Sequence, residues 1–240
     1  MGMHFGIIAG RASLDPLIQS FHDLGIELRF VKALDRLEDA PRDRNAAYII
    51  AGERAGMSYM VDEPMLLSGG KADVLASAAA KMGVLLVGCG AETVSGTFWL
   101  SAFDGPNPLR LFMACTMNLP VPFSQGVPLR SEAEQPLDSG LDGEGVWAAL
   151  KDLGFDYDSW VHSGPFRLLA LEELGAQGEQ PLEDAIAGHC GRHQLPVDQR
   201  PSISAMLRAP TAVSSPPESS RAAESDRRTL RDRLLRILGR

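Results

Sequence analysis

The stretch "GIIAGRASLDPLIQSFHDLGIELRF", residues 6–30, predicts a strand, a helix and a second strand in succession. A short apolar run ends at Gly10, and Ser13 is a suitable N-cap for the helix that follows. Gly25 is a suitable stop for that helix, and residues 26–31 then alternate between apolar and charged side chains, as in a half-buried strand. The helix presents one apolar face, at the spacing of three and four residues, made by Leu14, Leu17, Ile18, Phe21 and Leu24.

The next elements extend this pattern to a mixed fold. Residues 46–52 and 84–90 are short apolar runs typical of strands, and the alanine-rich residues 69–83 predict a second helix. The resulting order is strand, helix, strand, strand, helix, strand, which is the βαββαβ order of ferredoxin-like folds. We therefore expect an α+β fold built on this unit, with room for one more short strand around residues 59–61.

An aromatic β-hairpin is expected to follow this unit. Residues 97–103 and 109–116 are apolar runs that flank a turn-forming Asp-Gly-Pro-Asn-Pro sequence at 104–108. The proline-rich residues 119–140 are predicted to form an ordered loop. Further short elements are predicted as helices at 143–155 and 181–191 and as a strand that begins within 164–174.

The composition changes near residue 196 and divides the chain into three parts. Residues 1–195 are predicted to form a single α+β globular domain, and 196–224 a flexible linker rich in Pro, Ser and Ala. Residues 225–240 predict a basic amphipathic helix that is too short to be stable alone in water. We expect it to dock on another protein or on the chain's own acidic body, and a membrane surface is less favoured because the helix lacks Trp, Phe and Lys. Its predicted partner-binding residues are Leu230, Arg231, Leu234, Arg236, Ile237 and Leu238.

Charge and cysteine content exclude some classes of function. The formal net charge is −8, and residues 221–240 carry seven arginines against three acids, a local charge of +4 that leaves −12 on residues 1–220. General nucleic-acid binding is not expected of such an acidic body. Three cysteines do not form a disulfide framework, and no leader or long apolar run is evident, so a cytoplasmic location is predicted.

The segment "LLVGCGAETVSG", residues 85–96, is the candidate for chemistry. A cysteine between two glycines after a strand resembles the turn on which a catalytic nucleophile is exposed. In that interpretation Cys89 would be the nucleophile of a small hydrolase or transferase, with Glu92 or a distant histidine as its partner. The alternative is a tight corner in which Cys89 is a small buried residue. A dinucleotide-binding loop is excluded because Thr93 stands where G-x-G-x-x-G requires glycine.

No metal or other cofactor is expected. His189, Cys190 and His193 offer three donors, which do not complete a structural zinc site locally. The favoured function is therefore that of a non-catalytic binding or regulatory protein of bacterial type, adaptor-like or immunity-like. In this interpretation an acidic body carries an arginine-rich C-terminal docking helix, and the cysteine-dependent enzyme remains the alternative.

Overall fold

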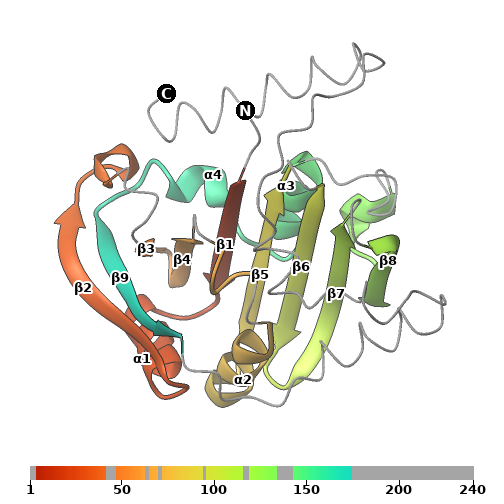
Figure 1. Ribbon diagram of the computed structural model, residues 1–240, viewed down its shortest axis with the longest axis horizontal. Coiled ribbons are helices and arrows are strands. Elements are labelled where there is room, and N and C mark those ends of the chain that lie inside the picture. Colours follow the sequence, from red (N-terminus) through yellow and green to blue (C-terminus); the bar gives the residue numbers. More distant parts are fainter. Residues whose placement is uncertain are drawn as a thin grey trace, which may run out of the picture.

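The computed structural model describes residues 4–41, 47–62, 65–69, 72–93, 96–115, 119–133 and 143–174. These residues form one sheet with helices on both of its faces (Figure 1). The predicted linker at 196–224 and the predicted helices at 181–191 and 225–240 lie outside the described residues. In the described part of the chain, no helix is both long enough and apolar enough to span a bilayer.

The sheet contains nine strands in the order β2-β9-β3-β4-β1-β5-β6-β7-β8, and every neighbouring pair is antiparallel. Short apolar runs explain the extended structure of buried strands such as β5 and β6, and alternation of apolar and charged residues explains the start of β2. The strands are β1 (His4–Gly10), β2 (Ile26–Leu34), β3 (Tyr48–Arg54), β4 (Met57–Asp62), β5 (Leu85–Glu92), β6 (Thr97–Asp104), β7 (Asn107–Cys115), β8 (Leu119–Gly126) and β9 (Phe166–Leu174).

The α+β class is confirmed, whereas the ferredoxin-like order is wrong. Strand β4, the optional strand of the sequence analysis, lies between β3 and β1 and pairs with both. Strand β1 therefore has antiparallel neighbours on both sides, β4 and β5. The late strand β9 inserts between β2 and β3. The βαββαβ segment is thus part of a larger sheet and does not close as a separate unit.

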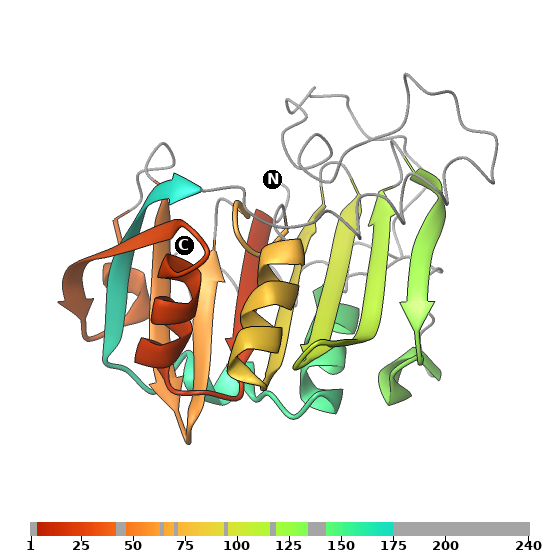
Figure 2. The same ribbon diagram turned by 90° about the horizontal axis from the view of Figure 1, so that it is seen from below.

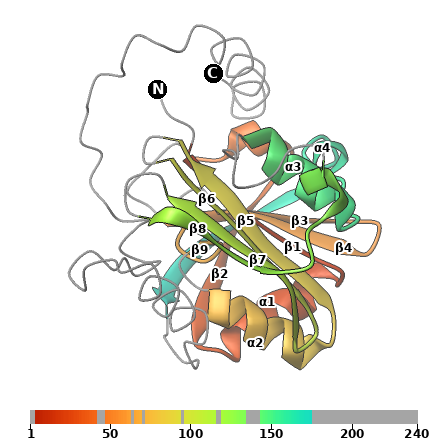
Figure 3. The ribbon, with the colours of Figure 1, turned by 90° about the vertical axis from the view of Figure 1, so that its right-hand side faces the viewer.

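Two pairs of helices cover opposite faces of the sheet (Figures 2 and 3). Helices α1 (Leu14–His22) and α2 (Ala72–Met82) lie side by side on one face. Helices α3 (Gly143–Asp152) and α4 (Tyr157–Trp160) lie on the other. Two short 3-10 turns complete the described elements, η1 (Leu37–Asp39) and η2 (Arg130–Ala133).

Each face has its own apolar core. Leu17 and Phe21 of α1 and Leu75 of α2 pack with Trp99 on the first face. The core beneath α3 and α4 is aromatic, and its rings stack in sequence. Ring centroids lie 5.3 Å apart for Phe5 and Trp147, 4.6 Å for Trp147 and Tyr157, 5.4 Å for Tyr157 and Trp160, and 5.3 Å for Trp160 and Tyr59. These contacts attach two short helices to the sheet.

Local patterns located most elements of the described chain correctly. The first helix, the strand at 26–31 and the helix at 143–155 are present, and the aromatic hairpin is formed by β6 and β7. The loop predicted at 119–140 is wrong at its start, because residues 119–126 form β8. Among the described strands β8 is the last of the sheet, a position where Pro120 and Pro122 are tolerated since no further described strand requires their missing N–H groups.

Candidate functional site

Cys89 lies inside a central strand and not on a turn after one. It pairs with Ile7 of β1 and with Leu100 of β6, and its side chain is fully buried. Burial raises the pKa of the Cys89 thiol, because a thiolate would lose its hydration there. The thiol belongs to the aromatic core that also contains Tyr157. Burial in this core is the main cause of the raised pKa of Tyr157 as well. The structure therefore supplies neither the exposed turn nor the low thiol pKa that a nucleophile needs.

Glu92 does not lie beside Cys89. The two residues are three positions apart on a regular strand, so their side chains leave it on opposite faces. Val87, Cys89 and Ala91 belong to the core beneath α3 and α4, whereas Leu86 belongs to the core beneath α1 and α2. Glu92 shares the face of Leu86 and is buried at the end of the strand. The pair proposed for catalysis is thus separated by the sheet itself.

The glycines on either side of Cys89 permit close packing. A Cβ at Gly88 would collide with Cδ1 of Leu75 from helix α2 and lie 3.0 Å from the carbonyl oxygen of Ser68. A Cβ at Gly90 would collide with the indole ring of Trp99 and the carbonyl oxygen of Phe5. Glycine in a strand interior often marks such an approach. The interpretation of Gly88-Cys89-Gly90 as a corner is therefore wrong, whereas Cys89 is the small buried residue that this alternative expected.

Gly90→Ala is expected to lower the free energy of unfolding by about 1–3 kcal/mol, because the added methyl group must displace a buried indole or a neighbouring strand. Equilibrium unfolding in urea would measure the change. On an exposed turn without a positive φ, alanine would be tolerated. An unchanged unfolding midpoint would therefore contradict the packing role assigned to this glycine.

Two other buried polar groups in the described chain have structural roles. The carboxylate of Asp62 accepts hydrogen bonds from the backbone N–H groups of Leu66, Leu67 and Ser68, at 3.2, 2.7 and 2.7 Å. Burial raises the pKa of Asp62, and the bonds from Ser68 and Leu67 oppose that shift. These three bonds fix the turn that follows β4 and carry no sign of a reaction site.

The second group is an ion pair between Arg110 of β7 and Glu132 of η2. It is bidentate, with Nε to Oε1 at 2.8 Å and Nη2 to Oε2 at 2.6 Å. The same guanidinium donates to the hydroxyl of Ser124 at 2.9 Å and to the carbonyl oxygen of Gln125 at 3.0 Å. All its described partners belong to the protein, so it joins η2 to the β7–β8 hairpin.

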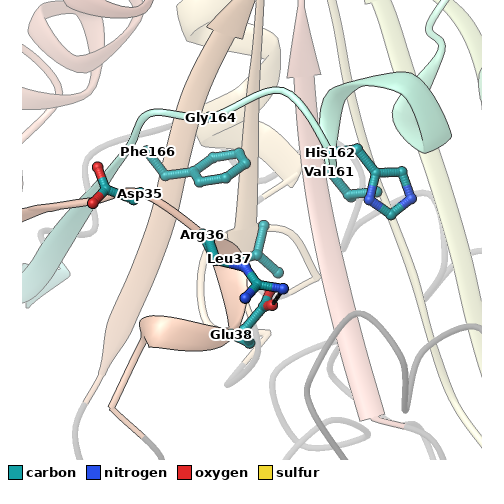
Figure 4. Close-up of a pocket in the computed structure, with 8 residues that line it drawn as sticks. All are labelled: Asp35, Arg36, Leu37, Glu38, Val161, His162, Gly164 and Phe166. Atoms are coloured by element: carbon teal, nitrogen blue, oxygen red, sulfur yellow. Dashed lines mark ion pairs between the residues drawn. The ribbon is translucent and has the colours of Figure 1, made fainter.

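A pocket of about 270 Å³ lies where η1 meets the connection from α4 to β9 (Figure 4). Three apolar side chains that line it, those of Leu37, Val161 and Phe166, are almost fully buried, and most of its exposed lining is polar. Its rim is polar, and Figure 4 shows Asp35 and His162 at opposite sides with Arg36 and Glu38 next to each other between them. Arg36 and Glu38 form an ion pair.

One wall of this pocket depends on Gly164. A Cβ there would collide with the carbonyl oxygen of Asp35, so the connection passes close to the end of β2 only because residue 164 has no side chain. The residues that form this pocket come from two segments 123 positions or more apart, 35–38 and 161–166, so no local pattern in the sequence indicates it.

Within the described ranges, no group of three or more His, Cys, Asp or Glu side chains is arranged to hold a metal ion. His189, Cys190 and His193 lie outside those ranges, as do Leu230, Arg231, Leu234, Arg236, Ile237 and Leu238. That the three donors at 189–193 bind no metal therefore stays a prediction. Partner binding by the six residues at 230–238 stays a prediction as well.

Comparisons with known proteins identify no relative of this chain. No protein-family model, no curated protein and no solved structure matches it.

Proposed function

We propose that this chain is a non-catalytic binding protein of adaptor or immunity type, which engages another protein through its arginine-rich C-terminal segment. The observation that carries this proposal is the division of charge between +4 on residues 221–240 and −12 on residues 1–220. Within the basic segment, Leu230, Leu234 and Ile237 recur at helical spacing among arginines. A short helix of this kind becomes stable when its apolar stripe is buried against a partner.

The pocket between η1 and β9 supports binding as the role of the body. It could receive one apolar side chain on Leu37, Val161 and Phe166, while Asp35 and Glu38 on the rim would make polar contacts. Interfaces commonly combine such a desolvated centre with a solvated rim. The sparse cysteines, of which the described Cys89 is free and buried, are consistent with the predicted cytoplasmic location.

Burial of Cys89 and the position of Glu92 on the other face favour binding over the cysteine-dependent alternative. A hydrolase or transferase of that kind requires a thiolate that solvent and substrate can reach. Opening the central strand β5 to expose it would break the pairing with both β1 and β6.

The docking segment is tested by placing charge on its apolar stripe in the full chain. The double variant L234D/I237D should lose at least about tenfold of its partner capture, because two carboxylates cannot enter an apolar groove. A matched control, A222D/A223D, adds the same charge outside the predicted helix and should capture the partner like the wild type. The measurement is quantitative cross-linking and mass spectrometry on cell extracts, with cross-links required within residues 225–240. Equal capture by the wild type and L234D/I237D would contradict the proposal.

A further inference from the structure

The two edges of the sheet differ in how they are protected. Strand β8 carries Pro120 and Pro122, and prolines at an edge remove N–H groups that could pair with another chain. Strand β2, at the opposite edge in Figure 1, has no proline in its nine residues, and in the described part of the chain it pairs only with β9. One edge is therefore blocked against further pairing, and the other has backbone groups available for it.

The open edge also exposes apolar side chains. Phe30 is 55% exposed and the adjacent Val31 is 38% exposed, and they are two of the four large apolar residues exposed in the described part of the chain. Ile26 and Leu28 share the face of Phe30 and are buried in the core beneath α1 and α2. Phe30 continues this apolar row beyond the cover of the helices, on a strand whose outer side has no neighbour among the described residues. Such an edge is a template for pairing.

We propose that β2 pairs with β2 of a second copy of this chain, antiparallel and with the twofold axis at Leu28. This register places Glu27 opposite Arg29 of the partner and Ile26 opposite Phe30 of the partner. Each contact occurs twice because the interface is symmetric. Opposite charges and apolar pairs at directly opposed positions stabilise antiparallel strands.

Neighbouring registers lack this complementarity. An axis at Arg29 would oppose two arginines, and an axis at Glu27 would oppose two glutamates. Pairing between β2 and β9 shifts register twice. The first shift, between Glu27 and Leu28, places the extra residue Glu172 on β9, so residues 26–30 of β2 itself contain no inserted residue. Pairing with β9 passes from Phe30 opposite Leu169 to Lys32 opposite Leu168, so Val31 is an extra residue that interrupts the strand. Residues 26–30 lie before that interruption.

A further charge contact, at Arg29, favours the same register. Arg29 already forms an ion pair with Glu172 of β9 in its own chain. In the dimer the carboxylate of Glu27 from the second copy would approach the same guanidinium from the other side, which gives Arg29 two acidic neighbours. Glu27, Arg29 and Phe30 are exposed in the single chain, so substituting them should leave the fold intact.

The test is sedimentation equilibrium of the full chain over a concentration range of about 1–200 μM. The wild type should form dimers. E27R places an arginine opposite Arg29 of the second copy on each side of the twofold axis. It should raise the dimer dissociation constant at least about tenfold. The swap E27R/R29E restores opposite charges across the axis and should bring dimerisation back toward the wild type. The control V127D alters a side chain 78% exposed beyond β8 and should have no effect.

A wild type that stays monomeric throughout, or a dimer that E27R leaves unchanged, would overturn this inference. The variant L234D/I237D separates the inference from the proposed function. It should dimerise normally, and a loss of dimers in that variant would show that the C-terminal segment, and not β2, holds the two copies together. Equal partner capture by the wild type and L234D/I237D, with dimerisation intact, would contradict the proposed function and still support the β2 interface.

Discussion

Replacing Arg110 by methionine is expected to lower the free energy of unfolding by about 3–5 kcal/mol. The side chains of Arg110 and Glu132 are only 3% and 6% exposed. The substitution would leave the Glu132 carboxylate buried with one remaining described donor, the backbone N–H of Leu129 at 2.9 Å. A buried charge that loses its counter-ion costs far more than the net contribution of the pair, because its desolvation is no longer compensated.

Removing both charges distinguishes the cost of an unpaired buried charge from the net contribution of the ion pair. The double variant R110M/E132L buries no charge at this position and should recover most of the stability that R110M loses. Lys81→Met is the matched control. It breaks an ion pair with Asp23 whose side chains are 50% and 35% exposed, and it should change stability far less than R110M does, because both charges remain hydrated. Urea unfolding of the four proteins would measure the differences, and equal losses in R110M and K81M would contradict the role given to burial.

Local sequence patterns predicted the helices and strands well, because the formation of a helix or strand depends largely on residues close to it in the sequence. The apolar face of residues 14–24 and the alternation at 26–31 can be read directly, and α1 and β2 lie where they were expected. The strand order had no comparable signal. β9 joins the sheet between β2 and β3, more than 100 residues away along the chain, and nothing in its own sequence specifies those neighbours. The ferredoxin-like order was wrong for this reason.

The candidate site was misjudged for a related reason. Glycine supports both a sharp turn and a close approach within a strand, and the choice between them depends on tertiary neighbours. Gly88 is required by the close approach of Leu75, and Gly90 by that of Trp99. Neither contact can be inferred from residues 85–96 alone. The pocket was missed because residues 35–38 and 161–166 each resemble ordinary charged or turn-forming segments until the fold brings them together.

The second large effect concerns the reactivity of Cys89. A buried thiol with a raised pKa reacts with a soluble reagent only when the structure around it opens. Opening a central strand typically costs several kcal/mol, and each 1.4 kcal/mol reduces the reactive population about tenfold. Labelling of Cys89 at neutral pH should therefore be at least about a hundredfold slower than labelling of free cysteine. Denaturant should remove the difference.

The labelling rate of Cys89 is also the most direct test of the claim that this chain acts by binding and not by thiol chemistry. A chromogenic or alkylating thiol reagent at pH 7, with peptide mass spectrometry to separate Cys89 from Cys115 and Cys190, gives the rate without any substitution. We predict slow labelling of Cys89 that accelerates only on unfolding. Labelling of the folded chain at Cys89 as fast as free cysteine, or faster, would contradict the account and restore the enzyme interpretation.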